Sequence, residues 1–182
     1  MTIDSLLFRR VLGHFATGVT ILTTRAPDGS IHGMTANAIT SVSLDPPLVL
    51  ACVDRRGRTH GYIAESRIFA LSMLGEDQHP LSERFARRSP ADGELWAEVP
   101  YRTAVTGAPI LAEAIAYVDC RLFATYPGGD HSIFVGEVLD LGVLTGRPPL
   151  IFFRGRYERL AEGRSGAPHL REAPVAWDDP GR

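Results

Sequence analysis

A group of small, hydroxylated and amide side chains lies between two apolar, strand-like runs in the first third of the chain. Its members are Thr35, Ala36, Asn37, Ala38 and Ser41, and the apolar run that follows ends in Ala51, Cys52 and Val53. Small side chains let the backbone approach a flat ring, and amides or hydroxyls can pair with its polar edge. The pattern is compatible with a site for a planar heterocycle. Composition alone favours the alternative, a half-buried strand whose polar side chains face solvent.

An arginine- and glycine-rich turn, DRRGRT at residues 54–59, follows this run directly and precedes a predicted helix. Backbone N–H groups in such a turn, together with the helix N-terminus, favour an anion, and an arginine can pair with a phosphate. We expect Arg58 and Thr59 to bind the phosphate and the N–H of Gly57 to be free for it. A solvated basic turn is the alternative.

Two further residues have types suited to positioning a ligand. His131 begins a predicted strand after a Gly-Gly-Asp turn, and Tyr157 lies in a Gly-Arg-Tyr sequence near the end of the last predicted strand. The alternatives are a hydrogen-bonded structural histidine and an aromatic residue that packs at the end of a barrel.

Motifs for several other chemistries are absent from the sequence. It contains no GxGxxG opening a βαβ unit, no GxxxxGK[ST], no GxSxG and no HExxH, and its two cysteines form no metal-ligand cluster. The sequence therefore predicts no Rossmann domain, no metal site and no hydrolase triad.

The hydrophobic pattern predicts many strands and few helices. Helices are expected from Asp4 or Ser5 to Phe15, over Thr59 to Glu65 and from Pro80 to Arg87, and strands over Val19–Thr24, Ile31–Thr40, Leu48–Val53, Ile68–Leu74, Ala114–Tyr126, His131–Leu141 and Leu150–Phe153. Short strands joined by hairpin turns favour a mainly β fold, an antiparallel barrel of six or seven strands with two or three peripheral helices. Residues 88–104 are predicted to form a surface excursion, and the domain organisation is 1–160 with a tail over 161–182.

Composition excludes some function classes. The chain has 182 residues, 45% of them hydrophobic, and a net charge of −2, which favours neither nucleic acid nor an anionic membrane. No apolar run approaches the roughly 18 residues of a membrane span, and no signal-peptide pattern is present. We expect a cytoplasmic protein with two reduced cysteines.

Five blocks of sequence, in order, resemble the flavin reductase family, the split-barrel proteins that bind FMN or FAD. They are residues 8–60, DQHPLSERFA at 77–86, TGAPIL at 106–111, GDHSIFVGEV at 129–138 and PPLIFFRGRYERL at 148–160. The resemblance covers roughly residues 5 to 160. It implies an antiparallel split β-barrel, a homodimer that shares the flavin site across its interface, and NADH or NADPH as reductant. Such proteins commonly supply reduced flavin to a separate monooxygenase.

The resemblance also implies roles for single residues. The flavin contacts would be Thr35, Ala36, Asn37, Ala38, Ser41, Ala51, Cys52, Val53, Arg58, Thr59, Gln78, Phe85 and Ala86, and the nicotinamide contacts His131 and Tyr157. The family often has a serine at the position of Gly57, and an aromatic residue such as Phe85 is more often part of the core than a ligand contact. No catalytic residue is expected, because a hydride passes directly between the cofactors.

Two other functions remain open from the sequence. One is a flavin-binding protein without turnover, which would load flavin but leave NADH unoxidised. The other is a flavoenzyme that reduces an organic substrate directly, which would retain its flavin through desalting.

Overall fold

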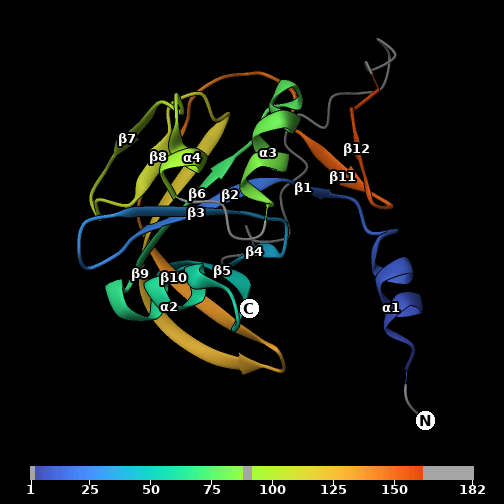
Figure 1. Cartoon of the computed structure of the whole chain (residues 1–182), viewed down its shortest axis with the longest axis horizontal. Helices are drawn as coiled ribbons and strands as arrows, with labels where there is room; N and C mark the ends of the chain where they lie inside the picture. Colours follow the sequence, from blue (N-terminus) through green and yellow to red (C-terminus); the bar gives the residue numbers. More distant parts are fainter. Residues whose placement is uncertain (1–2, 88–91, 162–182) are drawn as a thin grey trace, which may run out of the picture.

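The structure is a computed structural model that describes residues 3–87 and 92–161 (Figure 1). Its helices are α1 (Ser5–Leu12), α2 (Arg58–Ser66), the 3-10 helix η1 (Glu76–Gln78), α3 (His79–Phe85) and α4 (Asp92–Trp96). Its strands are β1 (Thr17–Gly18), β2 (Thr20–Arg25), β3 (Ile31–Ala36), β4 (Ile39–Leu44), β5 (Pro47–Asp54), β6 (Ile68–Met73), β7 (Tyr101–Thr103), β8 (Pro109–Leu111), β9 (Ala116–Gly128), β10 (His131–Val143), β11 (Ile151–Phe153) and β12 (Arg156–Glu158).

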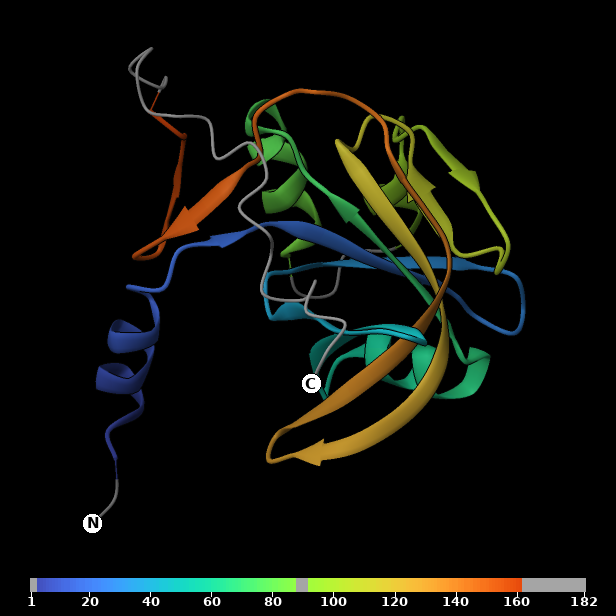
Figure 2. The same cartoon turned by 180° about the vertical axis from the view of Figure 1, so that it is seen from behind.

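Seven strands form one antiparallel sheet in the order β3-β2-β6-β9-β10-β5-β4. Side chains from β2, β3, β5, β6, β9 and β10 meet in a single buried cluster, in which Phe69 and Phe134 are the largest members. Strands from both edges of a sheet can share one core only if the sheet curls on itself, as Figures 1 and 2 show. The antiparallel barrel predicted from the sequence is therefore confirmed.

Helix α2 contributes to the same core from outside the sheet. Its Ile63 is fully buried in the barrel cluster, while the helix begins at Arg58 with Gly57 as its N-cap. Packing against the barrel therefore fixes the direction in which the N-terminus of α2 points.

A second buried layer covers the outer side of β2. Val19 and Ile21 pack with Phe85 of α3, Trp96 of α4 and Leu150. Every residue of β2 except Arg25 is buried, because this strand has the barrel core on one face and the outer layer on the other. Over residues 94–104 most positions are exposed, as the predicted surface excursion requires, but Leu95 and Trp96 are buried. Trp96 packs edge-on against Phe85 at 5.2 Å between ring centroids.

The barrel is split between β3 and β4. The sequence predicted one strand over residues 31–40, but β3 ends at Ala36 and β4 begins at Ile39. Asn37 and Ala38 join the two edge strands, and the Ala38 carbonyl accepts a hydrogen bond from Cys52 N at 2.9 Å. The chain changes partner here, since β3 pairs with β2 whereas β4 pairs with β5.

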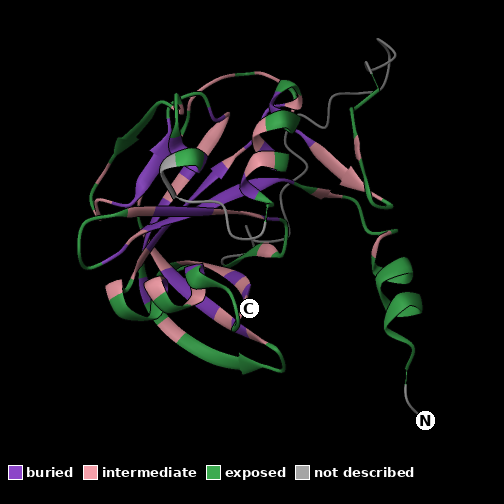
Figure 3. Ribbon diagram, viewed as in Figure 1, coloured by how far each residue is buried: buried purple, intermediate pink, exposed green. Residues whose placement is uncertain are grey.

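Helix α1 projects from the barrel. It begins where predicted, since the Asp4 carboxylate accepts from the N–H groups of Leu6 and Leu7, but it ends at Leu12 and not at Phe15. The apolar stripe of the helix, Leu7 and Val11, is 55% and 59% exposed, Phe15 beyond its end is 74% exposed, and no residue of the helix is buried (Figure 3). The predicted tail, apart from its first residue, lies outside the described residues, and no helix within them is long and apolar enough to cross a membrane.

Gly136 permits close approach of two strands inside the barrel. A Cβ at this position would lie 2.4 Å from Cζ of Phe69 and 2.8 Å from Cβ of Cys120. We therefore expect Gly136→Ala to destabilise the fold by about 1–3 kcal/mol, the usual cost of overpacking a core. Thermal unfolding measures it, with Gly146→Ala as the control, because a Cβ at Gly146 meets nothing within 4 Å. Equal melting temperatures for the two variants would contradict the packing described.

Candidate functional site

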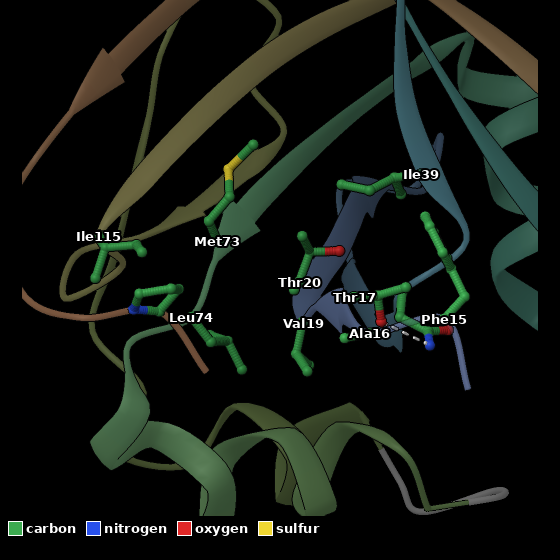
Figure 4. Close-up of a pocket in the computed structure, with 12 residues that line it drawn as sticks. Phe15, Ala16, Thr17, Val19, Thr20, Ile39, Met73, Leu74 and Ile115 are labelled. Carbon is green, nitrogen blue, oxygen red and sulfur yellow. Dashed lines mark hydrogen bonds between the residues drawn. The ribbon is translucent and has the colours of Figure 1, made fainter. Parts of the chain in front are cut away.

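A pocket of about 280 Å3 opens beside the split (Figure 4). Its walls are mostly apolar, and Thr17, Thr20 and Asn37 add polar groups. The full lining is Phe15, Ala16, Thr17, Gly18, Val19, Thr20, Asn37, Ile39, Met73, Leu74, Ile115 and Pro149. Largely apolar walls with a few placed polar groups are typical of a small-molecule site.

Asn37 contributes the amide at the edge of this pocket. Its Nδ2 donates to Oγ1 of Thr17 at 3.2 Å, which holds the amide against the segment that enters β2. The Thr20 hydroxyl donates to the Ala36 carbonyl at 2.7 Å, so this side chain stabilises the end of β3. Because Ala38 is bonded to Cys52, the structure brings the predicted residues 35–38 and 52 together at the split.

Other predicted flavin contacts point into the barrel. The side chains of Ala36, Ala51 and Val53 belong to the barrel core, which leaves only their backbone atoms for contact with a ligand. Cys52 is half-buried between Ala51 and Val53, and Ser41 is exposed on β4. Burial raises the pKa of the Cys52 thiol, which therefore stays protonated at neutral pH.

The N–H groups of the turn before α2 already have acceptors within the protein, contrary to the sequence-based expectation. Arg55 N donates to Asp130 O at 3.0 Å, Arg56 N to Oδ1 of Asp54 at 2.9 Å, and Gly57 N to Asp54 O at 3.0 Å. The prediction that Gly57 leaves its N–H free was wrong, because this N–H closes the turn. The anion-binding potential of the segment therefore lies in the first turn of α2, which begins with Arg58, exposed, and Thr59, buried.

Two acidic residues flank this turn, and each is paired. Asp54 binds Nε and Nη2 of Arg56 at 3.1 and 2.7 Å. These hydrogen bonds, followed by that from the backbone N–H of Arg56, lower the Asp54 pKa well below its ordinary value. Asp130 accepts from Nδ1 of His131 at 2.7 Å, which likewise lowers the Asp130 pKa. Arg56 is thus already paired with a carboxylate, that of Asp54, within the turn.

His131 lies next to the turn that precedes α2, because it pairs with Asp54 across β10 and β5. Tyr157 lies elsewhere. It belongs to the small sheet β1-β11-β12, where its hydroxyl lies 2.9 Å from Oγ of Ser82. Figures 1 and 2 show β12 and the β9–β10 turn at opposite ends of the molecule, so one chain does not bring His131 and Tyr157 together.

The predicted contacts on η1 and α3 have structural partners. Oε1 of Gln78 accepts from Gly75 N at 2.8 Å, Phe85 is buried in the outer layer, and Ala86 is exposed at the end of α3. Thr35 reaches this helix as well, since its hydroxyl donates to Ser82 O at 2.6 Å. The Thr35 side chain therefore lies on the α3 side of β3, and its hydroxyl proton is used in the bond to Ser82.

Sequence reasoning assigned no role to most of the residues that line the pocket. Residues 15–20 lead from α1 through β1 into the start of β2, and their hydroxyls and small residues are the sequence signal there. The walls from Met73, Leu74 and Ile115 are ordinary apolar residues whose approach to Asn37 depends on the tertiary fold. Among the described residues, no group of three or more His, Cys, Asp and Glu residues could hold a metal ion.

Comparison with known proteins identifies this arrangement. The flavin reductase like domain matches residues 12–161, which include the pocket, the split and the first turn of α2. The chain belongs to the flavin reductase family. The predicted resemblance is confirmed, over nearly the same residues.

Curated relatives of the family match most of the chain. The reductase component of a 4-nitrophenol 4-monooxygenase/4-nitrocatechol 2-monooxygenase from Rhodococcus opacus is 43% identical over 163 residues, covering 90% of this chain and 85% of the relative. An NADH-dependent FAD reductase from Streptomyces globisporus is 39% identical over 168 residues, covering 89% and 91%.

A solved family structure has the same fold. The NADH:FAD oxidoreductase of Streptomyces globisporus C-1027, in complex with NAD and FAD fragments, superposes with a TM-score of 0.80 at 38% identity. The match covers 87% of this chain and 93% of that one.

Proposed function

We propose that the protein is an NAD(P)H-dependent flavin reductase that supplies reduced FMN or FAD to a partner monooxygenase. The observation that carries the proposal is the apolar pocket edged by Asn37 at the barrel split, in a chain of this family. Its relatives include a monooxygenase reductase component and an NADH-dependent FAD reductase.

The chemistry of the pocket fits a flavin. Its apolar walls suit a flat ring system, and the Asn37 amide is placed to pair with the polar edge of such a ring. The first turn of α2 suits a phosphate, since the leading N–H groups of a helix have no intrahelical acceptor and its dipole favours an anion. We assign ring recognition to Asn37, Ala38, Ser41 and the backbone of residues 35, 36 and 51–53, and phosphate binding to Arg58 and Thr59.

The bound flavin and nicotinamide supply the hydride chemistry. The protein binds and orients them, and the walls formed by Val19, Leu74 and Ile115 keep water away from the ring. His131, held by Asp130, would position the nicotinamide dinucleotide without giving up a proton to the reacting atoms. No side chain is required as an acid or base at that step.

The proposal includes a homodimer in the cytoplasm, where NADH is produced and consumed. The exposed apolar stripe on α1 supports the dimer, because a large apolar patch of this kind usually marks an interface. A pocket of about 280 Å3 is also at the small end for a cofactor site, so a second copy would complete its enclosure. The separation of His131 from Tyr157 also supports a dimer. Both residues are assigned to the nicotinamide site, and they could meet there only if one of them came from a partner chain.

One assay tests the proposal. Purified protein is mixed with NADH or NADPH and with FMN, FAD or no flavin, and the nicotinamide absorbance is followed in time. We expect flavin-dependent oxidation with turnover well beyond one equivalent. Flavin binding without oxidation would support the flavin-binding alternative, and stoichiometric flavin retained through desalting would support the enzyme that keeps its flavin.

His131→Ala should raise KM for NADH about 10-fold and leave the flavin Kd near that of the wild type. The reason is the loss of a charge-assisted contact to the dinucleotide, worth about 1.5–3 kcal/mol. Steady-state kinetics and flavin titration measure the two quantities. His131→Asn keeps a donor and should recover part of the loss. If flavin binding falls while KM for NADH is unchanged, His131 belongs to the flavin site or to the fold.

A further inference from the structure

Ser82 lies between the flavin strand β3 and Tyr157. It is fully buried in α3, and it makes two contacts with these elements. Its carbonyl accepts from the Thr35 hydroxyl at 2.6 Å, and its own hydroxyl lies 2.9 Å from the Tyr157 hydroxyl. One residue of α3 therefore contacts the strand assigned to the flavin site and a side chain assigned to the nicotinamide site.

The ring of Tyr157 is fixed on more than one side. It packs edge-on against Phe152 at 5.6 Å between centroids and lies 6.1 Å from the ring of His79. The same residue lines a second pocket, of about 260 Å3, with Glu76, His79, Leu150, Glu158 and Arg159. The hydroxyl is thus anchored inside the protein while Tyr157 still borders a cavity.

In this arrangement the hydroxyl and the ring of Tyr157 have different roles: the hydroxyl anchors the side chain, and the ring is available to a ligand. A phenol bound through its oxygen to a buried group loses freedom about its side-chain torsions, so that its ring presents a fixed surface to a ligand. Neither Ser82 nor its hydroxyl borders either of the two pockets. The hydrogen bonds that link Ser82 to residues of the proposed sites are those with Tyr157 and Thr35.

We infer that Ser82 is a positioning residue that holds the Tyr157 ring in its ligand-binding orientation and couples it to β3. This inference rests on the proposed function, because it takes Tyr157 as a contact of the nicotinamide dinucleotide. The role belongs to the hydroxyl of Ser82, since the Thr35 contact uses the backbone carbonyl and survives substitution of the side chain.

The test is a double-mutant cycle on the full-length protein, with Ser82→Ala, Tyr157→Phe and the double variant. Binding of NAD+ is measured by titration calorimetry, and KM for NADH by steady-state kinetics. Each single variant removes the same hydrogen bond, so each should weaken NAD+ binding about 3- to 10-fold. The double variant should be no weaker than either single variant, because the two hydroxyls act as a pair. The flavin Kd should stay unchanged throughout.

Ser72→Ala is the matched control. Ser72 is also fully buried, and its Oγ accepts from Leu111 N at 3.1 Å, whereas the side chains of Tyr157 and Thr35 bond to Ser82. It should lower the melting temperature while NAD+ affinity and KM for NADH stay at wild-type values. The control therefore separates lost stability from lost positioning.

Several results would overturn the inference. One is a Ser82→Ala protein with a lower melting temperature but wild-type NAD+ affinity, since Ser82 would then serve the fold alone. Another is additive losses in the double variant. If Ser82→Ala fails to fold, Tyr157→Phe alone must still weaken NAD+ binding, and wild-type binding in that variant would also overturn the inference. A wild-type protein that neither binds NAD+ nor oxidises NADH would overturn the proposed function itself.

Discussion

Arg58→Ala is expected to raise the Kd for FMN about 10-fold or more. Arg58 is the first residue of α2, and its side chain is exposed at the end of the helix that favours an anion. The turn before it cannot substitute for the lost group, because the N–H groups of residues 55–57 have protein acceptors and Arg56 is paired with Asp54. A charge-assisted hydrogen bond to phosphate is worth about 1.5–3 kcal/mol.

Fluorescence titration of FMN measures this change, and two controls make it specific. Arg121→Ala removes the same charge from an exposed ion pair with Glu137 and should leave the Kd unchanged. Riboflavin, which lacks the phosphate, should bind the wild-type and Arg58→Ala proteins equally. An unchanged FMN Kd would remove Arg58 from the site, whereas an equal loss for riboflavin would place it at the ring.

Replacing Leu7 and Val11 together by Asp should convert a dimer into monomers. Both side chains lie on the exposed stripe of α1, and burying each is worth about 1.5–3 kcal/mol. Because the change occurs in both copies, the dimer dissociation constant should rise at least about a thousandfold. Analytical ultracentrifugation measures it, and turnover should fall with the dimer if the second copy completes the pocket.

Substitution of the other face of the same helix provides the control. Arg9→Gln keeps a good helix former and alters only a polar position on the face opposite Leu7 and Val11, so dimerisation should persist. The melting temperature of the Leu7 and Val11 variant should reflect only the loss of association, since no residue of α1 is buried within one chain. A wild-type protein that sediments as a monomer would refute the dimer proposal.

Local signals in the sequence were sufficient for much of the fold. The alternation and β-branched residues of the strands, the Asp4 cap of α1 and the glycine before α2 act over a few residues, so they can be recognised without the tertiary structure. The strand pattern predicted an antiparallel barrel, and the family resemblance specified that this barrel is split. By contrast, β3 and β4 merged into one predicted strand, because Asn37 and Ala38 contain no strong breaker and the split results from a change of pairing partner.

The missed parts of the site depend on contacts between distant residues. Which acceptor satisfies the N–H of Gly57 is decided by the conformation of Asp54, and the residue types alone leave both outcomes open. Trp96 lies in a polar stretch, yet it is buried because Phe85 and Gly33 provide a surface for it. The bond between Ser82 and Tyr157 joins residues 75 positions apart. Such contacts have no periodic or local signature.

Gly33 allows helix α3 to pack close to strand β3. A Cβ at this position would lie 2.8 Å from the ring of Phe85 and 3.3 Å from that of Trp96, so α3 rests almost directly on the backbone of β3. A larger residue at this position would push α3 away from β3. Ser82 lies one turn before Phe85 in the same helix and would move with it. The absence of a side chain at Gly33 therefore sets the distance between α3 and β3, and a substitution there would shift Ser82 relative to both Thr35 and Tyr157.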